Sequence, residues 1–402
     1  MPMLNALILT ATLLQSNGPS SAIDKPGNRI DQIVEIAWRD DEQAGKIDEK
    51  RQKDLDRDVD LGKEYSKQVE KELKLSKNEE YIKRVERIGQ EMAAIANATQ
   101  AEVTWGDKRP SRFKYQFQVV QGEDVNAFSL PGGFIYVYEG LVKYIESDDE
   151  LAGVLGHEIS HAAFRHVWAL QRQSEKVQIG TLLALIVAAM TRSKDAGNIL
   201  SGVQLGAQAF QSAWSQDAER AADYGGLQFM ERSRYDPTGC VTFMERLARD
   251  ERSKNGIDWG IFRTHPPSKE RVQNLLAYMA KANLPVRRSA VTSTFRTQIK
   301  PGDNGNVEAW FNGKKIYTFA GSDALTRADN AAKKLDDFYD QVPSMIEVTD
   351  GEGVVLFNIR PLLYVHPDDA AAMKVSVQNL TEQTTKAIKG SLFSLAYRIW
   401  GS

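Results

Sequence analysis

Cysteine is almost absent from this chain of 402 residues, which has only one, at position 240. A single cysteine excludes an internal disulfide and any zinc cluster built from several thiolates. Cys240 lies in YDPTGCVTFMERL, which is typical of a turn that enters a helix. We interpret it as a small packed side chain rather than as a nucleophile.

An excess of basic charge is also missing. The chain has 51 Lys and Arg against 54 Asp and Glu, so its formal net charge is −3. No stretch of the sequence combines basic residues with stacking aromatics, so nothing indicates a nucleic-acid partner. The contents of hydrophobic residues (42%) and charged residues (26%) are ordinary for a globular protein. The length predicts two or three compact units.

The sequence contains no apolar run long enough for a transmembrane helix, which needs about 20 residues. The longest candidate is VQIGTLLALIVAAM, from Val177 to Met190. We predict a core helix or a partly exposed hydrophobic hairpin here. The alternative is a surface that contacts a membrane peripherally or binds client proteins.

The N-terminus resembles an export signal. LNALILTATLL, from Leu4 to Leu14, has the length of a signal-peptide core, and Ser20, Ser21 and Ala22 offer small residues for cleavage. The first five residues lack Lys and Arg, which is atypical. We predict a signal peptide over residues 1–22 and an exported location in the periplasm or cell envelope. The alternative is an apolar N-terminal helix.

Local patterns divide the rest of the chain into three parts. Residues 23–62 are charged and predict a linker with an exposed helix. Residues 63–288 predict the main domain, with a helical stripe that includes Val85, Ile88 and Met92. After residue 289 a strand-like pattern followed by a helical one occurs twice, which predicts an accessory α+β domain over 289–402. The predicted fold class is α+β, mainly helical with a small β-sheet.

Inside the main domain, two strands and three helices are expected. The strands are YQFQVVQG, from Tyr115 to Gly122, and GGFIYVYEG, which follows a turn. The helices span about 147–172 and 207–232, and a third begins near Ser268. Ser147, followed three residues later by Glu150, predicts a capping box at the start of the first helix.

The first helix carries the sequence LAGVLGHEISHAAFRH. At about 100° per residue, His157 and His161 share one face of the helix and can bind one ion. Glu158 lies at the edge of that face, where its carboxylate can reach a metal-bound water. An HExxH pattern alone also fits a polar helical face, so a further ligand is required.

His166 fails as that ligand, because nine residues place it on the face opposite His157. The segment SQDAERAADYGG, which begins at Ser215, offers a better candidate. Glu219 and Asp223 share one face of a second helix, and neighbouring alanines allow close approach of the two helices. We predict Glu219 as the third ligand and Asp223 as the acceptor of a hydrogen bond from a zinc-bound histidine. Asp217 is expected to cap this helix.

Three protein ligands leave one position of Zn²⁺ for water, as in catalytic rather than structural sites. Glu158 is then the general base, and the oxyanion needs a hydrogen-bond donor. His265, in RTHPPSKERV, is the best candidate donor, because it precedes a helix that starts with proline. The alternative is a loop histidine stacked on the helix start. His366, in the accessory domain, is expected to be structural.

Four ordered motifs resemble metallopeptidase family forty-eight, which includes the CAAX prenyl proteases, the HtpX heat-shock proteases and periplasmic proteases such as BepA. These motifs are VNAFSLPGGFIYVYEGLV, DDELAGVLGHEISHAAFRH, QDAERAADYGG and THPPSKERV, and the resemblance covers about half of the chain. It implies a gluzincin fold with one zinc per chain, held by His157, His161 and Glu219. Because it lacks the long transmembrane helices of the integral-membrane members, the chain looks like the soluble, exported branch. Members of that branch often carry a helical-repeat C-terminal domain, and no such repeat follows Ser289.

The resemblance also implies how substrate is held. Asn126 and His265 are expected to hold the reacting carbonyl. The strand with Gly133, Phe134, Ile135 and Tyr136 is expected to be an edge on which a peptide substrate pairs. A Pro-Gly-Gly turn before this strand independently suits close approach of another backbone.

These observations predict a zinc-dependent endopeptidase that acts on protein or peptide substrates, misfolded or membrane-associated ones, in envelope protein quality control. The alternative is a chaperone-like binding protein with a latent or structural metal site. That alternative depends on the apolar Val177–Met190 segment and on the accessory domain.

Overall fold

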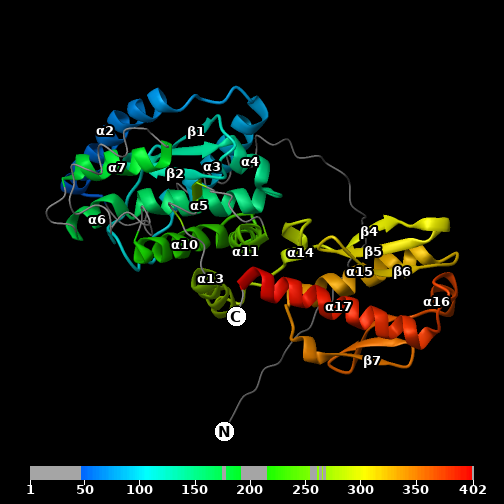
Figure 1. Cartoon of the computed structure of the whole chain (residues 1–402). Coiled ribbons are helices and arrows are strands. Elements are labelled where there is room, and N and C mark those ends of the chain that lie inside the picture. The colour runs from blue at the N-terminus through cyan, green and yellow to red at the C-terminus, as the bar shows by residue number, and fades with distance from the viewer. Residues whose placement is uncertain are drawn as a thin grey trace, which may run out of the picture.

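The computed structural model describes residues 47–173, 178–191, 215–253, 260–261, 265 and 269–400. The predicted signal peptide and most of the charged linker lie outside these residues, as does the predicted start of the second helix at 207–214. Figure 1 shows two lobes, the first rich in helices and the second built from two small sheets and several helices.

The first lobe surrounds a three-stranded sheet with helices (Figure 1). Its elements are α2 (Glu49–Glu72), α3 (Glu79–Ala98), β1 (Gln116–Val120), β2 (Ala127–Leu130), the 3₁₀ turn η1 (Pro131–Gly133), β3 (Phe134–Tyr138), α4 (Glu139–Tyr144), α5 (Asp148–Ala163), α6 (His166–Gln173), α7 (Ile179–Thr191), α10 (Gln216–Glu231), α11 (Thr238–Ser253), α13 (Lys269–Lys281) and α14 (Arg288–Val291).

Side-chain caps define the first two helices. Asp48 accepts a hydrogen bond from the backbone of Arg51 at the start of α2, and Asn78 caps α3 in the same way. The predicted stripe of α3 is confirmed, since Val85, Ile88 and Met92 are fully buried. Helix α2 runs without interruption through the predicted boundary at residue 62.

The strand order corrects the predicted substrate edge. β3 lies in the middle of the sheet, parallel to β1 on one side and antiparallel to β2 on the other. The segment expected to be a simple turn contains β2, so both sides of β3 are already paired. Gly133, Phe134, Ile135 and Tyr136 are therefore buried and offer no free edge. The sequence pattern does not show which strands pair, and it gave no sign of the additional strand β2.

The long helix predicted over 147–172 is broken. α5 ends at Ala163, Arg165 adopts a left-handed backbone conformation (φ 53°), and α6 begins at His166. The ring of His166 consequently returns to the side of His161 instead of lying on the opposite face. The prediction that His166 lies on the face opposite His157 is wrong, because the helix is interrupted between the two residues.

The apolar segment forms α7, which belongs to the core of the first lobe. Leu183, Ile186 and Val187 are buried in a cluster that also includes Tyr65 of α2 and Phe128 of β2. This confirms the prediction of a core helix for the described part of the segment. Within the described ranges, no helix combines the length and the apolar character needed to cross a membrane.

The second lobe has two antiparallel sheets with the strand orders β4-β5-β6 and β7-β8-β9. Figure 1 shows the long helices α15 and α17 between these sheets, and both helices contact both of them. The elements are β4 (Gln298–Pro301), η2 (Asp303–Gly305), β5 (Val307–Phe311), β6 (Lys314–Phe319), α15 (Ala324–Asp340), η3 (Met345–Glu347), β7 (Val348–Gly351), β8 (Val354–Phe357), β9 (Arg360–Tyr364), α16 (Pro367–Ala372) and α17 (Val377–Trp400).

The two lobes meet through α14 and α11. Arg288 of α14 forms two hydrogen bonds of 2.8 Å with the carboxylate of Glu245 on α11, and it also donates to the backbone carbonyl of Asp340 at the end of α15. Helix α17 also packs against α11. The second lobe is thus attached to a helix that lines the candidate site described below.

Candidate metal centre

Helix α5 positions His157, Glu158 and His161. Its N-cap is Ser147, whose hydroxyl accepts a hydrogen bond from the backbone of Glu150. The carboxylate of Glu150 accepts from the backbone of Glu146 rather than from that of Ser147, so only half of the predicted capping box forms. It also pairs with Arg246 of α11. The start of α5 is therefore tied to a neighbouring helix.

Helix α10 packs closely against α5 through small residues. Ala218, Ala221 and Ala222 are fully buried, as expected. At Gly226 a Cβ atom would lie 3.0 Å from the backbone nitrogen of His157, so only glycine fits here without a shift. Because Gly226 has no side chain, the two helices approach closely here, and the carboxylates of α10 lie beside the histidines of α5.

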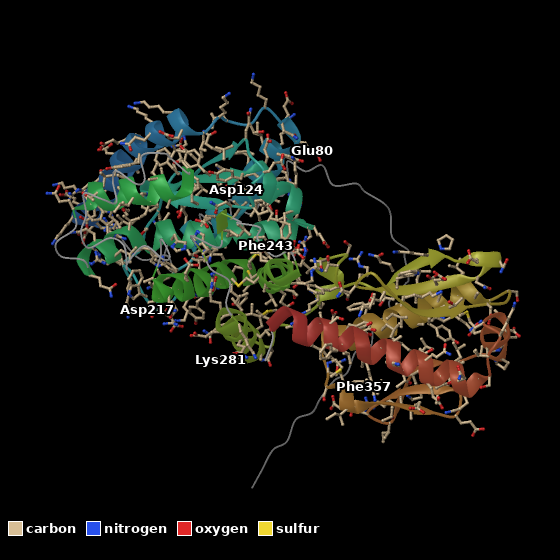
Figure 2. All side chains as sticks on the ribbon, viewed as in Figure 1. Glu80, Asp124, Asp217, Phe243, Lys281 and Phe357 are labelled. Carbon is tan, nitrogen blue, oxygen red and sulfur yellow. The ribbon has the colours of Figure 1, made fainter. Side chains whose placement is uncertain are left out.

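The expected cap of α10 is wrong. Ser215, and not Asp217, accepts the hydrogen bond from the backbone of Ala218. Asp217 lies at the outer surface, as Figure 2 shows, and pairs with Arg220 at 2.5 Å. A serine one position before the helix satisfies the first turn equally well, which leaves Asp217 free for the surface.

Three side chains converge where α5 and α10 meet. Nε2 of His157 lies 3.0 Å from Nε2 of His161. The two carboxylate oxygens of Glu219 lie 3.5 Å and 3.4 Å from these nitrogens. The structure thus brings together the three residues that sequence spacing singled out as metal ligands, and all three are buried or nearly so.

Each histidine of this group has a partner at its other nitrogen. Nδ1 of His157 lies 2.9 Å from Oδ1 of Asp223, the contact expected from the sequence. Nδ1 of His161 lies 2.8 Å from Nδ1 of His166, which was not expected. Burial lowers the pKa of His166 to about 3 and places the pKa of His161 well below its usual range. Burial thus favours the neutral form of both rings.

Sequence reasoning missed Arg271, which lies fully inside the site. Its guanidinium forms hydrogen bonds of 2.7 Å to both oxygens of Asp223, and Nη1 lies 2.9 Å from Oε2 of Glu219. Burial raises the pKa values of both carboxyls, but the positive charge of Arg271 and, at Glu219, that of His265 lower them by more. Both carboxyls are ionised. The only signal was the motif THPPSKERV, in which KER is also typical of a solvated helical face.

His265 joins the same group. Nδ1 of this ring lies 2.9 Å from Oε1 of Glu219, and Nε2 lies 3.4 Å from Oε1 of Glu158. Burial lowers its pKa, but the two carboxylates raise it by more, so the ring favours the charged form. With His157, His161 and Glu219 it forms a set of four potential ligand atoms that all lie within 4.8 Å of one another.

Glu158 faces a cavity of about 40 Å³ beside these residues. Its carboxylate is 2% exposed. Within the described residues, neither Oε2 of Glu158 nor Nε2 of His265 has a hydrogen-bond partner. Burying polar atoms without a partner costs free energy, so both atoms are arranged for a group that binds in the cavity. The apolar walls of the cavity are formed by Val154, Phe243, Met244, Leu247, Ile261 and Leu275.

The arrangement of lone pairs fits a cation. Nδ1 of His157 faces a carboxylate and must carry the hydrogen, so Nε2 of this ring presents a lone pair. That lone pair points at a second imidazole nitrogen and at an ionised carboxylate, and such acceptors repel one another unless a positive charge lies between them. Two imidazole nitrogens and one carboxylate are a donor set that Zn²⁺ accepts. The residues present thus fit a divalent metal ion.

Asn126 is not in the cavity. It is fully buried at the start of β2, and its side chain packs against Gly260, where a Cβ atom would lie 2.9 Å from Nδ2. The backbone carbonyl of Asn126 accepts a hydrogen bond from Tyr138. Gly260 and Ile261 connect this position to the segment that carries His265, since Ile261 donates to the carbonyl of Val125.

Comparisons with known proteins agree with this site. Residues 80–279 match the model of peptidase family M48. The chain is 31% identical over 204 residues to the metalloprotease LoiP of Escherichia coli, which covers 49% of this chain and 70% of that protein. It is 31% identical over 174 residues to the mitochondrial metalloendopeptidase OMA1 of Schizosaccharomyces pombe, covering 43% of this chain and 49% of that protein.

The beta-barrel assembly-enhancing protease of Yersinia pestis is 28% identical over 203 residues, which cover 49% of this chain and 39% of that protein. The chain therefore spans half or less of the length of OMA1 and of this protease. The family match contains the helices α5 and α10 and the residue His265, and it ends before the second lobe.

Proposed function

The chain belongs to peptidase family M48, a family of metallopeptidases, and from that premise we propose that it is a zinc-dependent endopeptidase of the gluzincin type. One observation carries the proposal. His157, His161 and Glu219 converge within ligand distance of one another, directly beside the buried carboxylate of Glu158. We propose these three as the ligands of one zinc ion per chain.

Zinc bound by three protein ligands supplies an acidified water and polarises a peptide carbonyl. Glu158 would act as the general base, taking a proton at its carboxylate and passing it to the leaving amine. Oε2 of Glu158 suits this role, because it is buried and has no hydrogen-bond partner among the described residues. Asp223 and Arg271 hold His157 and Glu219 in place.

We assign His265 to the reacting carbonyl. Its ring favours the charged form, and a charged imidazole is a strong donor to a developing oxyanion. The same ring could instead supply a fourth protein ligand, which would close the site as in structural zinc centres. The two roles predict different results when His265 is removed, as discussed below.

Protein substrates, envelope location and a role in quality control extend this proposal. They are supported by the apolar segment at residues 4–14 and by the name of one relative, a beta-barrel assembly-enhancing protease, whereas the relative OMA1 is mitochondrial. For the chaperone-like alternative, the described part of the apolar segment is packed inside the first lobe, so this segment does not favour it.

Replacement of Glu158 by Gln tests the proposal. The full chain is assayed on an unfolded, fluorescently labelled protein, with zinc content and melting temperature measured on the same samples. We expect Glu158→Gln to lose about 10²- to 10⁴-fold in rate while it keeps its zinc. Glu80→Gln, an exposed position on α3, is the control and should be fully active. Unchanged activity of Glu158→Gln would refute the assignment of the base.

A further inference from the structure

His166 was set aside as a metal ligand, yet it is fully buried against one. We propose that His166 is a positioning residue that fixes the tautomer of His161, so that Nε2 of His161 presents a lone pair to the metal. The inference rests on the proposed function and goes beyond it, because it assigns a role outside the ligand set.

A chain of three groups leads away from the candidate metal position. Nδ1 of His161 lies 2.8 Å from Nδ1 of His166, and Nε2 of His166 lies 3.2 Å from the backbone carbonyl oxygen of Trp105. The rings of the two histidines meet edge to face, with centroids 4.8 Å apart. Trp105 also packs its indole against His166 at 5.2 Å.

The far end of this chain sets its direction. A carbonyl oxygen only accepts, so Nε2 of His166 carries a hydrogen and donates it to Trp105. In a neutral ring, Nδ1 of His166 then has a lone pair and accepts from His161. His161 must therefore carry its hydrogen on Nδ1, which leaves the lone pair on Nε2, the atom that faces His157 and Glu219.

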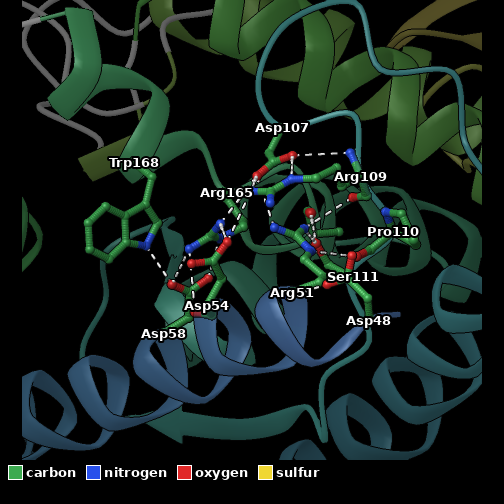
Figure 3. A network of polar contacts seen from close by, with 11 residues as sticks. Asp48, Arg51, Asp54, Asp58, Asp107, Arg109, Pro110, Ser111, Arg165 and Trp168 are labelled. Atoms are coloured by element: carbon green, nitrogen blue, oxygen red, sulfur yellow. Dashed lines mark hydrogen bonds and ion pairs between the residues drawn. The ribbon is translucent and has the colours of Figure 1, made fainter. Parts of the chain in front are cut away.

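The break between α5 and α6 makes the contact between His161 and His166 possible. Arg165 adopts the left-handed conformation that turns the chain back, and such a conformation is unfavourable for a residue with a Cβ atom. Its guanidinium is held by both oxygens of Asp58 at 2.6 Å and 2.8 Å and by Asp107 at 3.2 Å (Figure 3). These buried ion pairs hold the turn that brings His166 beside His161.

The loop that carries the acceptor is fixed to the same turn. The backbone of Asp107 donates to the carbonyl of Phe164 at 2.8 Å. Gly106 has a φ of 117°, and a Cβ atom there would lie 2.6 Å from the oxygen of Phe164 and 3.0 Å from the ring of His166. The loop with Trp105 is thus attached to the turn that precedes His166, which keeps the carbonyl of Trp105 near the ring of His166. The two zinc-facing histidines have different outer partners: a carboxylate for His157 and a neutral ring for His161.

Three variants of the full chain separate this role from simple packing. His166→Asn keeps an acceptor near the position of Nδ1, His166→Gln keeps only a donor near Nε2, and His166→Phe keeps the ring without either nitrogen. Zinc affinity is measured by competition with a chromogenic chelator. We expect His166→Gln and His166→Phe to weaken zinc binding by about 10- to 100-fold, and His166→Asn to stay within about 3-fold of the parent chain.

A second readout does not depend on zinc. The chain has five histidines, so ¹⁵N-histidine spectra are simple enough to assign by substitution. In the zinc-free parent we expect His161 to carry its hydrogen on Nδ1, and in His166→Phe we expect a mixture of tautomers. Melting temperatures identify a variant that fails to fold. If His166→Phe fails to fold, the difference in zinc affinity between His166→Asn and His166→Gln decides.

The outcomes distinguish the two proposals. Equal zinc affinity of His166→Phe, His166→Gln and the parent would overturn the role of His166 and leave the endopeptidase proposal intact. So would a zinc affinity of His166→Asn as weak as that of His166→Gln. A parent chain that binds no zinc would overturn the proposed function. In that case the tautomer of His161 in the parent and in His166→Phe still decides whether His166 fixes it.

Discussion

Asp223 and His157 come from different helices and are joined by a hydrogen bond of 2.9 Å between Oδ1 and Nδ1. Arg271 holds both oxygens of the same carboxylate from a third helix. The contact therefore connects α5, α10 and α13 around one imidazole ring. It also fixes the tautomer of His157, because an ionised carboxylate requires a hydrogen on the nitrogen that it contacts. The hydrogen is therefore on Nδ1, and Nε2 presents its lone pair toward Glu219.

Replacement of Asp223 by Asn removes the charge while keeping the size. The new amide can turn its NH₂ group toward His157 and would then favour the wrong tautomer. We expect zinc affinity to fall by about 10- to 100-fold. Asp217→Asn, at an exposed position of the same helix, is the control and should bind zinc like the parent. Equal affinities of the two variants in a chelator titration would contradict the role of Asp223.

Acid should destabilise the chain through Asp107, which pairs with Arg51, Arg109 and Arg165. Burial raises the pKa of Asp107, but hydrogen bonds from Arg109 and the charge of Arg51 lower it by more, well below its usual range. The ionised form of Asp107 is thus favoured by folding. Its contribution to stability is complete above the unfolded-state pKa, about 4, and is lost as the pH falls toward the folded-state value.

The melting temperature of the zinc-free chain, measured from pH 7 to pH 3, checks this linkage. We expect the parent to lose stability below about pH 4, and Asp107→Asn to start lower and fall less steeply over the same range. Parallel curves for the two proteins would show that Asp107 does not contribute to the acid sensitivity.

Substitution of His265 distinguishes its two possible roles, as a hydrogen-bond donor to the reacting carbonyl or as a required zinc ligand. If His265 holds the reacting carbonyl, His265→Ala keeps one zinc per chain, because His157, His161 and Glu219 remain. The rate of peptide hydrolysis then falls by about 10²- to 10³-fold, the usual cost of losing one oxyanion donor. Zinc content and rate measured on the same samples decide the question. A loss of most of the zinc would show instead that His265 is a ligand.

The close packing of α5 and α10 predicts that one added methyl group at Gly225 lowers the stability of the fold. A Cβ atom at Gly225 would lie 2.5 Å from the ring of Phe164 and 2.6 Å from the hydroxyl of Ser160. We expect Gly225→Ala to lose about 1–3 kcal/mol of stability through overpacking. Gly390→Ala on α17, with nothing within 4 Å, should gain about 0.5–1 kcal/mol from its better helix propensity. Denaturant unfolding of both variants measures these differences, and destabilisation of similar size would refute the packing argument.

Much of the candidate site could be predicted because its residues follow local spacing. His157 and His161 share a helical face through their separation by four, and so do Glu219 and Asp223. The alanines around Glu219 indicated that a second helix could approach. Each of these inferences needs only the geometry of a helix, which the sequence specifies within one or two turns.

The features that could not be predicted depend on tertiary pairing. β3 became a central strand because β1, some twenty residues away, pairs with it in parallel, and no local pattern specifies that partner. His166 returned to His161 because Asp58 and Asp107 stabilise a left-handed residue between two helices. Arg271 looked like part of a solvated face until the fold buried it between two carboxylates. In each case the deciding interaction joins residues that are distant in the sequence.

The central claim is that His157, His161 and Glu219 hold one catalytic zinc ion, and the most direct test is the metal content of the purified full chain with and without Glu219→Ala. Inductively coupled plasma mass spectrometry on both proteins, after passage over a desalting column, measures the zinc-to-protein ratio. We predict one zinc per chain in the parent and close to none in Glu219→Ala, with circular dichroism showing that both are folded. An unchanged zinc ratio in the folded Glu219→Ala protein would contradict the account.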